Sequence, residues 1–120
     1  MDRIHSNVKV LVSTGIAGVI FIYAVYSNKP LLLIAGAVFD LLPLLLNWMN
    51  WRAIVESGNR SIMVLVRLHV TLTIIAYTVG LSWIATSNRI LSLVFLELWW
   101  IAVILGSITA HLGYRRLYNT

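Results

Sequence analysis

The chain alternates between long apolar stretches and short breaks that are rich in charged and turn-forming residues. A helix needs roughly 20 mostly apolar residues to cross a hydrocarbon core about 30 Å thick. Because backbone polar groups inside lipid must bond internally, stretches of this length predict membrane-spanning α-helices. Four stretches qualify, and they cover residues 8–27, 30–51, 61–86 and 90–113. The breaks at 27–30, 52–60 and 87–89 are predicted to connect them.

Basic residues lie mainly on one side of this predicted four-helix arrangement. With four spans, the N-terminus, the middle connection and the C-terminus share a side. The other side holds only Lys29 and Arg89 of the nine basic residues. Because Lys and Arg concentrate in cytoplasmic segments, the sequence predicts that both termini are cytoplasmic. The seven basic residues on that side are Arg3, Lys9, Arg52, Arg60, Arg67, Arg115 and Arg116.

The composition supports a membrane protein. Of the 120 residues, 60% are hydrophobic and 11% are charged, whereas soluble domains are closer to half apolar and a quarter charged. Nine basic and four acidic residues are too few to cover so much apolar surface. We therefore expect an all-α integral membrane four-helix bundle, one domain over residues 1–120, in the cell membrane. The absence of cysteine excludes disulfides and thiolate metal sites.

Polar and small residues follow helical spacing within the predicted spans, so they share faces. Because an ionisable residue inside lipid is costly, the faces that carry such residues are predicted to point to the interior of the bundle or to a cavity. The second span carries Gly36, Asp40, Pro43 and Asn47 on one stripe. The third span aligns His69, Thr73, Ala76 and Gly80. The fourth span aligns Glu97, Trp100, Ser107 and His111. Small residues allow helices to approach closely, and the candidates for such packing are Gly15, Gly18, Gly106 and Ala110.

Two carboxyl groups lie within the spans at similar depths. Asp40 is about ten residues and Glu97 about eight residues from the outer ends of their helices, a difference of a few Å. Such groups act as relays in pumps and transporters, so Asp40 and Glu97 are candidates for a proton-handling pair. The alternative is that each bonds to a neighbouring helix, or pairs with a basic residue of another subunit.

The three histidines, His5, His69 and His111, lie toward the cytoplasmic end. Neutral imidazole is a common axial ligand of haem iron, and helix bundles hold cofactors between facing helices. One hypothesis is that His69 and His111 ligate a b-type haem between the third and fourth helices. The alternative is that His69 bonds to Thr73 or another helix and His111 extends to lipid headgroups.

Four short elements carry a resemblance that covers the whole chain. They are His5-Ser6, Asn47-Trp48 or Asn50-Trp51, Arg67-Leu68-His69 and His111-Leu112-Gly113-Tyr114-Arg115-Arg116. Together they resemble a family of small four-helix membrane proteins classed only as a domain of unknown function. The last element is also similar to the His, Gly and Arg run of succinate dehydrogenase membrane anchors. That similarity implies contact with haem b and quinone.

The sequence supports two candidate functions. The favoured one is a small integral subunit of a larger respiratory or oxidative membrane complex, with a structural role and contact with haem b or quinone. Its partners would be lipid and other membrane subunits, not nucleic acid. The alternative is an oligomeric transporter or channel that uses Asp40 and Glu97 as coupling groups. An enzyme is not expected, because the sequence has no Ser/His/Asp set, phosphate loop or metal-ligand cluster.

Overall fold

The computed structural model describes residues 2–46, 52, 56 and 60–118, and the secondary structure within these ranges is helical, without a strand. Helix α1 spans Asp2–Tyr26, α2 spans Leu32–Leu46, α4 spans Arg60–Thr86 and α5 spans Arg89–Tyr118. The prediction of an all-α, four-helix fold is confirmed. Arg52 and Glu56, from the predicted middle break, are also helical and form an ion pair of 2.9 Å.

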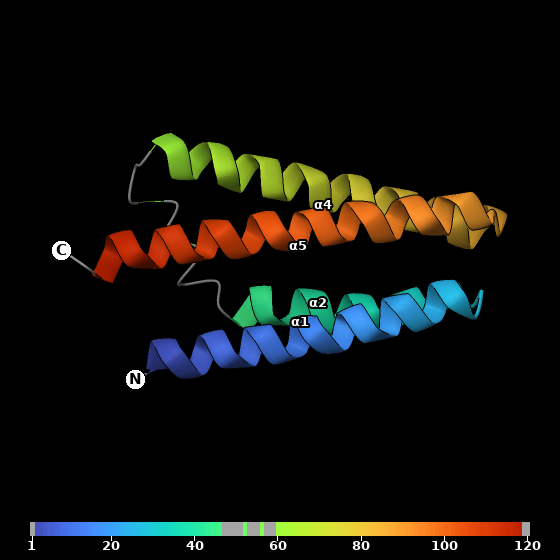
Figure 1. The fold of residues 1–120 in the computed structure, drawn as a ribbon, viewed down its shortest axis with the longest axis horizontal. Coiled ribbons are helices and arrows are strands. Elements are labelled where there is room, and N and C mark those ends of the chain that lie inside the picture. Colours follow the sequence, from blue (N-terminus) through green and yellow to red (C-terminus); the bar gives the residue numbers. More distant parts are fainter. Residues whose placement is uncertain (1, 47–51, 53–55, 57–59, 119–120) are drawn as a thin grey trace.

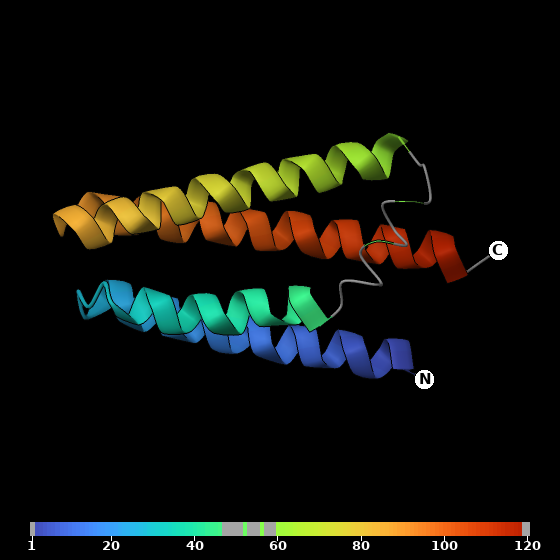
Figure 2. The same ribbon diagram turned by 180° about the vertical axis from the view of Figure 1, so that it is seen from behind.

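The helices form two antiparallel hairpins that lie side by side (Figures 1 and 2). Helix α1 packs along α2, α4 packs along α5, and α1 also contacts α5. The molecule measures 49 × 27 × 17 Å along its principal axes. Helix α1 begins and α5 ends at the same end of the bundle, while the two short turns lie at the opposite end (Figure 1).

Asn28 closes the first hairpin with a left-handed backbone conformation, at a φ of 53°. The amide of Asn28 donates to the Val25 carbonyl at 3.3 Å, and the amide of Lys29 donates to the Ala24 carbonyl at 2.9 Å. This pair of bonds is the Schellman arrangement at a helix C-terminus. Pro30 follows and cannot continue α1. The turn predicted at residues 27–30 is confirmed.

The second hairpin turns at the break predicted over residues 87–89. Ser87 has a φ of 56°, and its amide donates to the Trp83 carbonyl at 2.7 Å, which ends α4. The Asn88 side-chain oxygen then accepts a hydrogen bond from the Ile90 amide at 2.9 Å. That bond satisfies an otherwise free amide in the first turn of α5, so Asn88 serves as its N-cap.

Two of the described helices are long and apolar enough to cross a membrane, namely α4 and the Arg89–Leu112 part of α5. Only 11% of the most apolar segment of α4 and 22% of that of α5 are buried inside the molecule. A core helix of a soluble protein would be mostly buried. The described parts of α1 and α2 contain shorter apolar stretches, Val10–Tyr26 and Leu32–Leu42. The second predicted span, 30–51, continues beyond the described residues.

The core lies between the two hairpins and is built from small residues and large rings. Phe21 of α1 is fully buried and lies directly against Gly36 of α2. A Cβ atom at Gly36 would lie 2.3 Å from Cε1 of the Phe21 ring, so this close approach of α1 and α2 requires glycine. The core cluster comprises Ala17, Phe21, Ala24, Val25, Leu33, Ala76, Trp83, Phe95 and Trp99.

Helix α5 faces the core with a different side from the one predicted. The stripe formed by Glu97, Trp100, Ser107 and His111 is exposed. The inward side carries Phe95, Trp99 and Ala102, together with Ser92 and Thr109. Burial of two large aromatic rings contributes more stability than burial of one polar stripe, so the rings determine the rotation of α5. The predicted inward orientation of the Glu97 stripe is therefore wrong.

Candidate functional site

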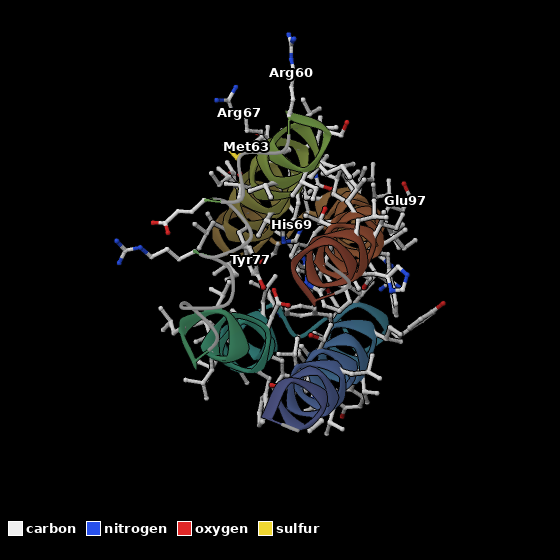
Figure 3. All side chains as sticks on the ribbon, turned by 90° about the vertical axis from the view of Figure 1, so that its left-hand side faces the viewer. Arg60, Met63, Arg67, His69, Tyr77 and Glu97 are labelled. Carbon is white, nitrogen blue, oxygen red and sulfur yellow. The ribbon has the colours of Figure 1, made fainter. Side chains whose placement is uncertain are left out.

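Asp40 of α2 is the polar centre of the bundle. Its Oδ2 atom accepts a hydrogen bond of 2.5 Å from the Tyr77 hydroxyl and one of 3.2 Å from the Trp99 indole N–H. Tyr77 lies on α4 and Trp99 on α5, so both bonds cross from one hairpin to the other. Figure 3, viewed along the bundle, shows Tyr77 directed from α4 toward the centre of the bundle. One carboxyl oxygen thus joins the two hairpins.

Aromatic rings enclose this network. The Phe21 ring meets Phe95 edge to face at a centroid distance of 5.0 Å, Trp99 at 4.9 Å and Tyr77 at 6.4 Å. Such arrangements place positive ring edges against negative ring faces, which is the favoured geometry of aromatic pairs. The four rings come from α1, α4 and α5, and they fill the space beside Asp40.

Helical spacing places these groups. Gly36 and Asp40 are four residues apart and share a face of α2, and Gly36 is buried while Asp40 is half-buried. Gly36 contacts the Phe21 ring. One turn further along α2, Asp40 accepts the hydrogen bond from Tyr77. Their inward orientation agrees with the sequence prediction. The side chain of Pro43 and the whole of Asn47 lie outside the described part of the chain.

His69 belongs to α4, and its side chain lies between α4 and α5 (Figure 3). Its Nδ1 atom lies 2.9 Å from the Ala102 carbonyl oxygen. Because a carbonyl oxygen only accepts hydrogen bonds, Nδ1 carries a proton and donates it. A Cβ atom at Gly106 would lie 2.7 Å from Cε1 of the imidazole ring. The ring therefore fills the close contact between the two helices.

The other members of the predicted His69 face also point inward. Thr73 is half-buried, and Ala76 and Gly80 are buried. The Thr73 hydroxyl donates to the His69 carbonyl at 2.8 Å, within the same helix. A Cβ atom at Gly80 would lie 2.9 Å from Leu33 and 3.0 Å from Phe95. The absence of a side chain at Gly80 therefore lets both α2 and α5 approach α4 closely. The predicted face of the third span is confirmed.

The structure does not bring His111 to His69. His111 is exposed, and it lies nine residues after Ala102, which is half a turn from that residue on an ideal helix. The His69 ring fills the contact between α4 and α5 at Gly106, where a haem between these helices would have to fit. These two histidines therefore do not fit a bis-histidine haem site in this chain. The side chain of His5 lies outside the described residues.

Asp40 and Glu97 are likewise separated. Glu97 is exposed and projects from the outer side of α5, away from Tyr77 and His69 (Figure 3). It precedes Trp99, which donates to Asp40, by two residues, and side chains two residues apart on a helix point in nearly opposite directions. The single chain thus contains no carboxyl pair at Asp40 and Glu97.

The predicted packing residues behave differently from one another. A Cβ atom at Gly18 would lie 3.3 Å from the Trp99 ring, and one at Gly106 would collide with His69. Both glycines therefore lie in contacts between helices, as predicted. A Cβ atom at Gly15 would meet nothing within 4 Å, so Gly15 packs against no other helix in the described part of the chain. Ala110 is half-buried.

Sequence reasoning missed the partners of Asp40. Tyr77 and Trp99 lie 37 and 59 residues from it along the chain. The available signal was their position in the middle of a span, where a tyrosine or tryptophan needs a partner for its polar group. Trp83 was also missed as a core residue. It is fully buried, and its Nε1–H has no acceptor among the described residues.

No family model, no curated protein and no solved structure matches this chain. The two resemblances based on short elements therefore remain predictions.

Proposed function

We propose that the chain spans a membrane four times, with both termini on the cytoplasmic side, and acts as a structural subunit of a larger membrane assembly. The first support is its apolar exterior. Large hydrophobic side chains are exposed on every described helix, including Leu11 at 73%, Leu45 at 72%, Leu81 at 63% and Ile90 at 69%. A soluble monomer rarely exposes contiguous apolar surface of this extent, whereas lipid covers such a surface favourably.

The charges support the proposed orientation. Arg52, Arg60 and Arg67 are exposed, and Arg60 and Arg67 project outward from α4 (Figure 3). Helix α4 begins with Arg60, at the end of the bundle at which α1 begins and α5 ends (Figure 1). Lys29 and Arg89 lie at the two turns of the opposite end. This asymmetry follows the rule that basic residues remain on the cytoplasmic side.

The main support for a structural role is that side chains fill the centre of the bundle. Phe21, Tyr77, Phe95 and Trp99 occupy it in mutual contact. The buried hydroxyls of Ser92 and Thr109 bond to carbonyls of their own helix. A pore or carrier needs polar groups that face a path through the protein. A bundle filled by rings is better suited to hold its shape and to bind neighbours through its outer faces.

Haem b and quinone are not part of this proposal. His69 donates to Ala102 and fills the space at Gly106, while His111 lies on an exposed face. The respiratory or oxidative character of the assembly follows only from the resemblance to succinate dehydrogenase anchors.

Purification from the native membrane tests the proposal. The tagged chain is extracted in a mild detergent, separated by native electrophoresis, and the accompanying proteins are identified by mass spectrometry. We expect one discrete complex that contains a fixed set of other membrane proteins. A monomer, or an oligomer of this chain alone, would contradict the structural-subunit proposal.

The second candidate is a proton-coupled carrier, and the inter-helix carboxyl group of Asp40 is the observation that favours it. Carriers place such groups near the membrane midplane. Reconstitution of the purified chain into vesicles with a pH gradient distinguishes the two functions. A carrier would move protons with its substrate and lose this activity in Asp40→Asn, whereas a structural subunit would show no such flux.

A further inference from the structure

Glu97 lies within an otherwise apolar surface on the outer side of α5. Its neighbours one turn away are exposed hydrophobic residues, with exposed fractions from 37% at Val94 to 48% at Leu93 and Ile101. Ile90 and Ile104 extend the surface in both directions, at 69% and 56% exposure. We call this surface the α5 outer face, and it comprises Ile90, Leu93, Val94, Glu97, Trp100, Ile101 and Ile104.

The position of Glu97 requires a polar partner if the chain spans the membrane as proposed. Glu97 lies eight residues after Arg89, which is about 12 Å along the helix from the outer end of α5. That depth is within the hydrocarbon core, where ionisable side chains pair with one another or face a protein interior. Within the described part of the chain, Glu97 has no hydrogen bond or ion pair.

We propose that the α5 outer face binds a transmembrane helix of a different protein, and that a lysine or arginine of this helix pairs with Glu97. The inference rests on the proposed role as a subunit and names the surface and the chemistry of the partner. A symmetric pair of two copies presents the same surface twice. It would place Glu97 against Glu97, which are like groups, so charge complementarity favours a partner that carries a basic residue.

Trp100 adds a second recognition element for such a cation. It follows Glu97 by three residues, so both lie on the same side of α5. Its side chain is 42% exposed, and its ring packs against Trp99 at a centroid distance of 5.2 Å. Indole faces attract ammonium and guanidinium groups, most strongly where water is excluded. A basic side chain that reaches Glu97 therefore finds an aromatic surface beside the carboxyl group.

Site-directed photo-cross-linking in native membranes tests the inference. The chain has no cysteine, so Ile101→Cys or Ile104→Cys carries the only thiol for a benzophenone maleimide. Val19→Cys on α1 and Ile74→Cys on α4 are matched controls, because these residues are 68% and 61% exposed on other helices. We expect both α5 variants to form an adduct with one protein that has a lysine or arginine within a transmembrane helix. The two controls should not form this adduct.

The charge of Glu97 is tested in the Ile101→Cys background. Glu97→Gln should lower the adduct yield by roughly tenfold or more, because the amide cannot form the ion pair. Glu56→Gln removes another exposed acidic residue, outside the four helices, and should leave the yield unchanged. Glu97→Lys should abolish the adduct, and exchange of the partner's basic residue for glutamate should restore it.

The outcomes separate this inference from the proposed function. An adduct of twice the mass of this chain overturns it, and so does an adduct whose yield is unchanged in Glu97→Gln. If native electrophoresis shows a mixed complex but α5 forms no adduct, the subunit function stands and the α5 outer face is not its interface. If no mixed complex exists, both are overturned.

Discussion

The hydrogen bonds at Asp40 need an acceptor atom rather than a charge. Tyr77 and Trp99 both donate to the same oxygen, Oδ2. The side-chain oxygen of asparagine can occupy this position and accept both bonds. We therefore expect Asp40→Asn to melt close to the wild type in detergent, and Asp40→Leu to melt clearly lower, as followed by size-exclusion chromatography after heating. A large loss of stability in Asp40→Asn would show that the carboxyl group has a further role.

The Tyr77 hydroxyl should contribute measurably to stability. Removing it in Tyr77→Phe deletes the shorter of the two bonds at Asp40, and hydrogen bonds between membrane helices contribute about 0.6 kcal/mol on average and up to about 1.7 kcal/mol. We expect unfolding in mixed micelles to show a loss in this range. Tyr23→Phe is the matched control, because Tyr23 is 54% exposed and its hydroxyl has no described acceptor. Equal losses in both variants would contradict an inter-hairpin bond at Tyr77.

At the scale of the helices, glycine sets the approach of α1 to α2. Gly36→Ala places a methyl group 2.3 Å from a Phe21 ring that three other rings hold in place, so the ring cannot move without loss of packing. We expect a loss of about 1–3 kcal/mol. Gly15→Ala is the control, because it meets open space and alanine favours a helix by about 1 kcal/mol. The melting temperatures should move in opposite directions, and a lower value for Gly15→Ala would reveal a partner at that position.

The helices and turns were predictable because each depends on local sequence. Long apolar stretches predict helices, and Asn28 and Asn88 occur where turn and capping positions need them. The inward position of Asp40 also followed from the pattern on α2. Its partners did not, because they depend on how α4 and α5 rotate about their axes. The predicted rotation of α5 is wrong because Phe95 and Trp99 occupy the side that faces the core, and Glu97 faces outward.

At the scale of the whole molecule, the proposed four-span orientation predicts which residues are accessible from outside the cell. The two turns lie at one end, and the starts of α1 and α4 lie at the other (Figure 1). The absence of native cysteine makes single-cysteine labelling specific. We expect Ser27→Cys and Thr86→Cys to react with a membrane-impermeant maleimide in intact cells, and Ser61→Cys to react only after permeabilisation. Denatured samples should label equally in all three variants, which controls for expression.

The labelling pattern also distinguishes four spans from two. If only α4 and α5 crossed the membrane, Thr86→Cys would still react from outside, but Ser27→Cys would not. The core argues against that arrangement, because Asp40 of α2 and Phe21 of α1 contact Tyr77 and Trp99 in the middle of α4 and α5. Helices α1 and α2 must therefore reach the same depth as their partners. Labelling of Ser27→Cys from outside would confirm that the shorter apolar stretches cross the membrane with the longer ones.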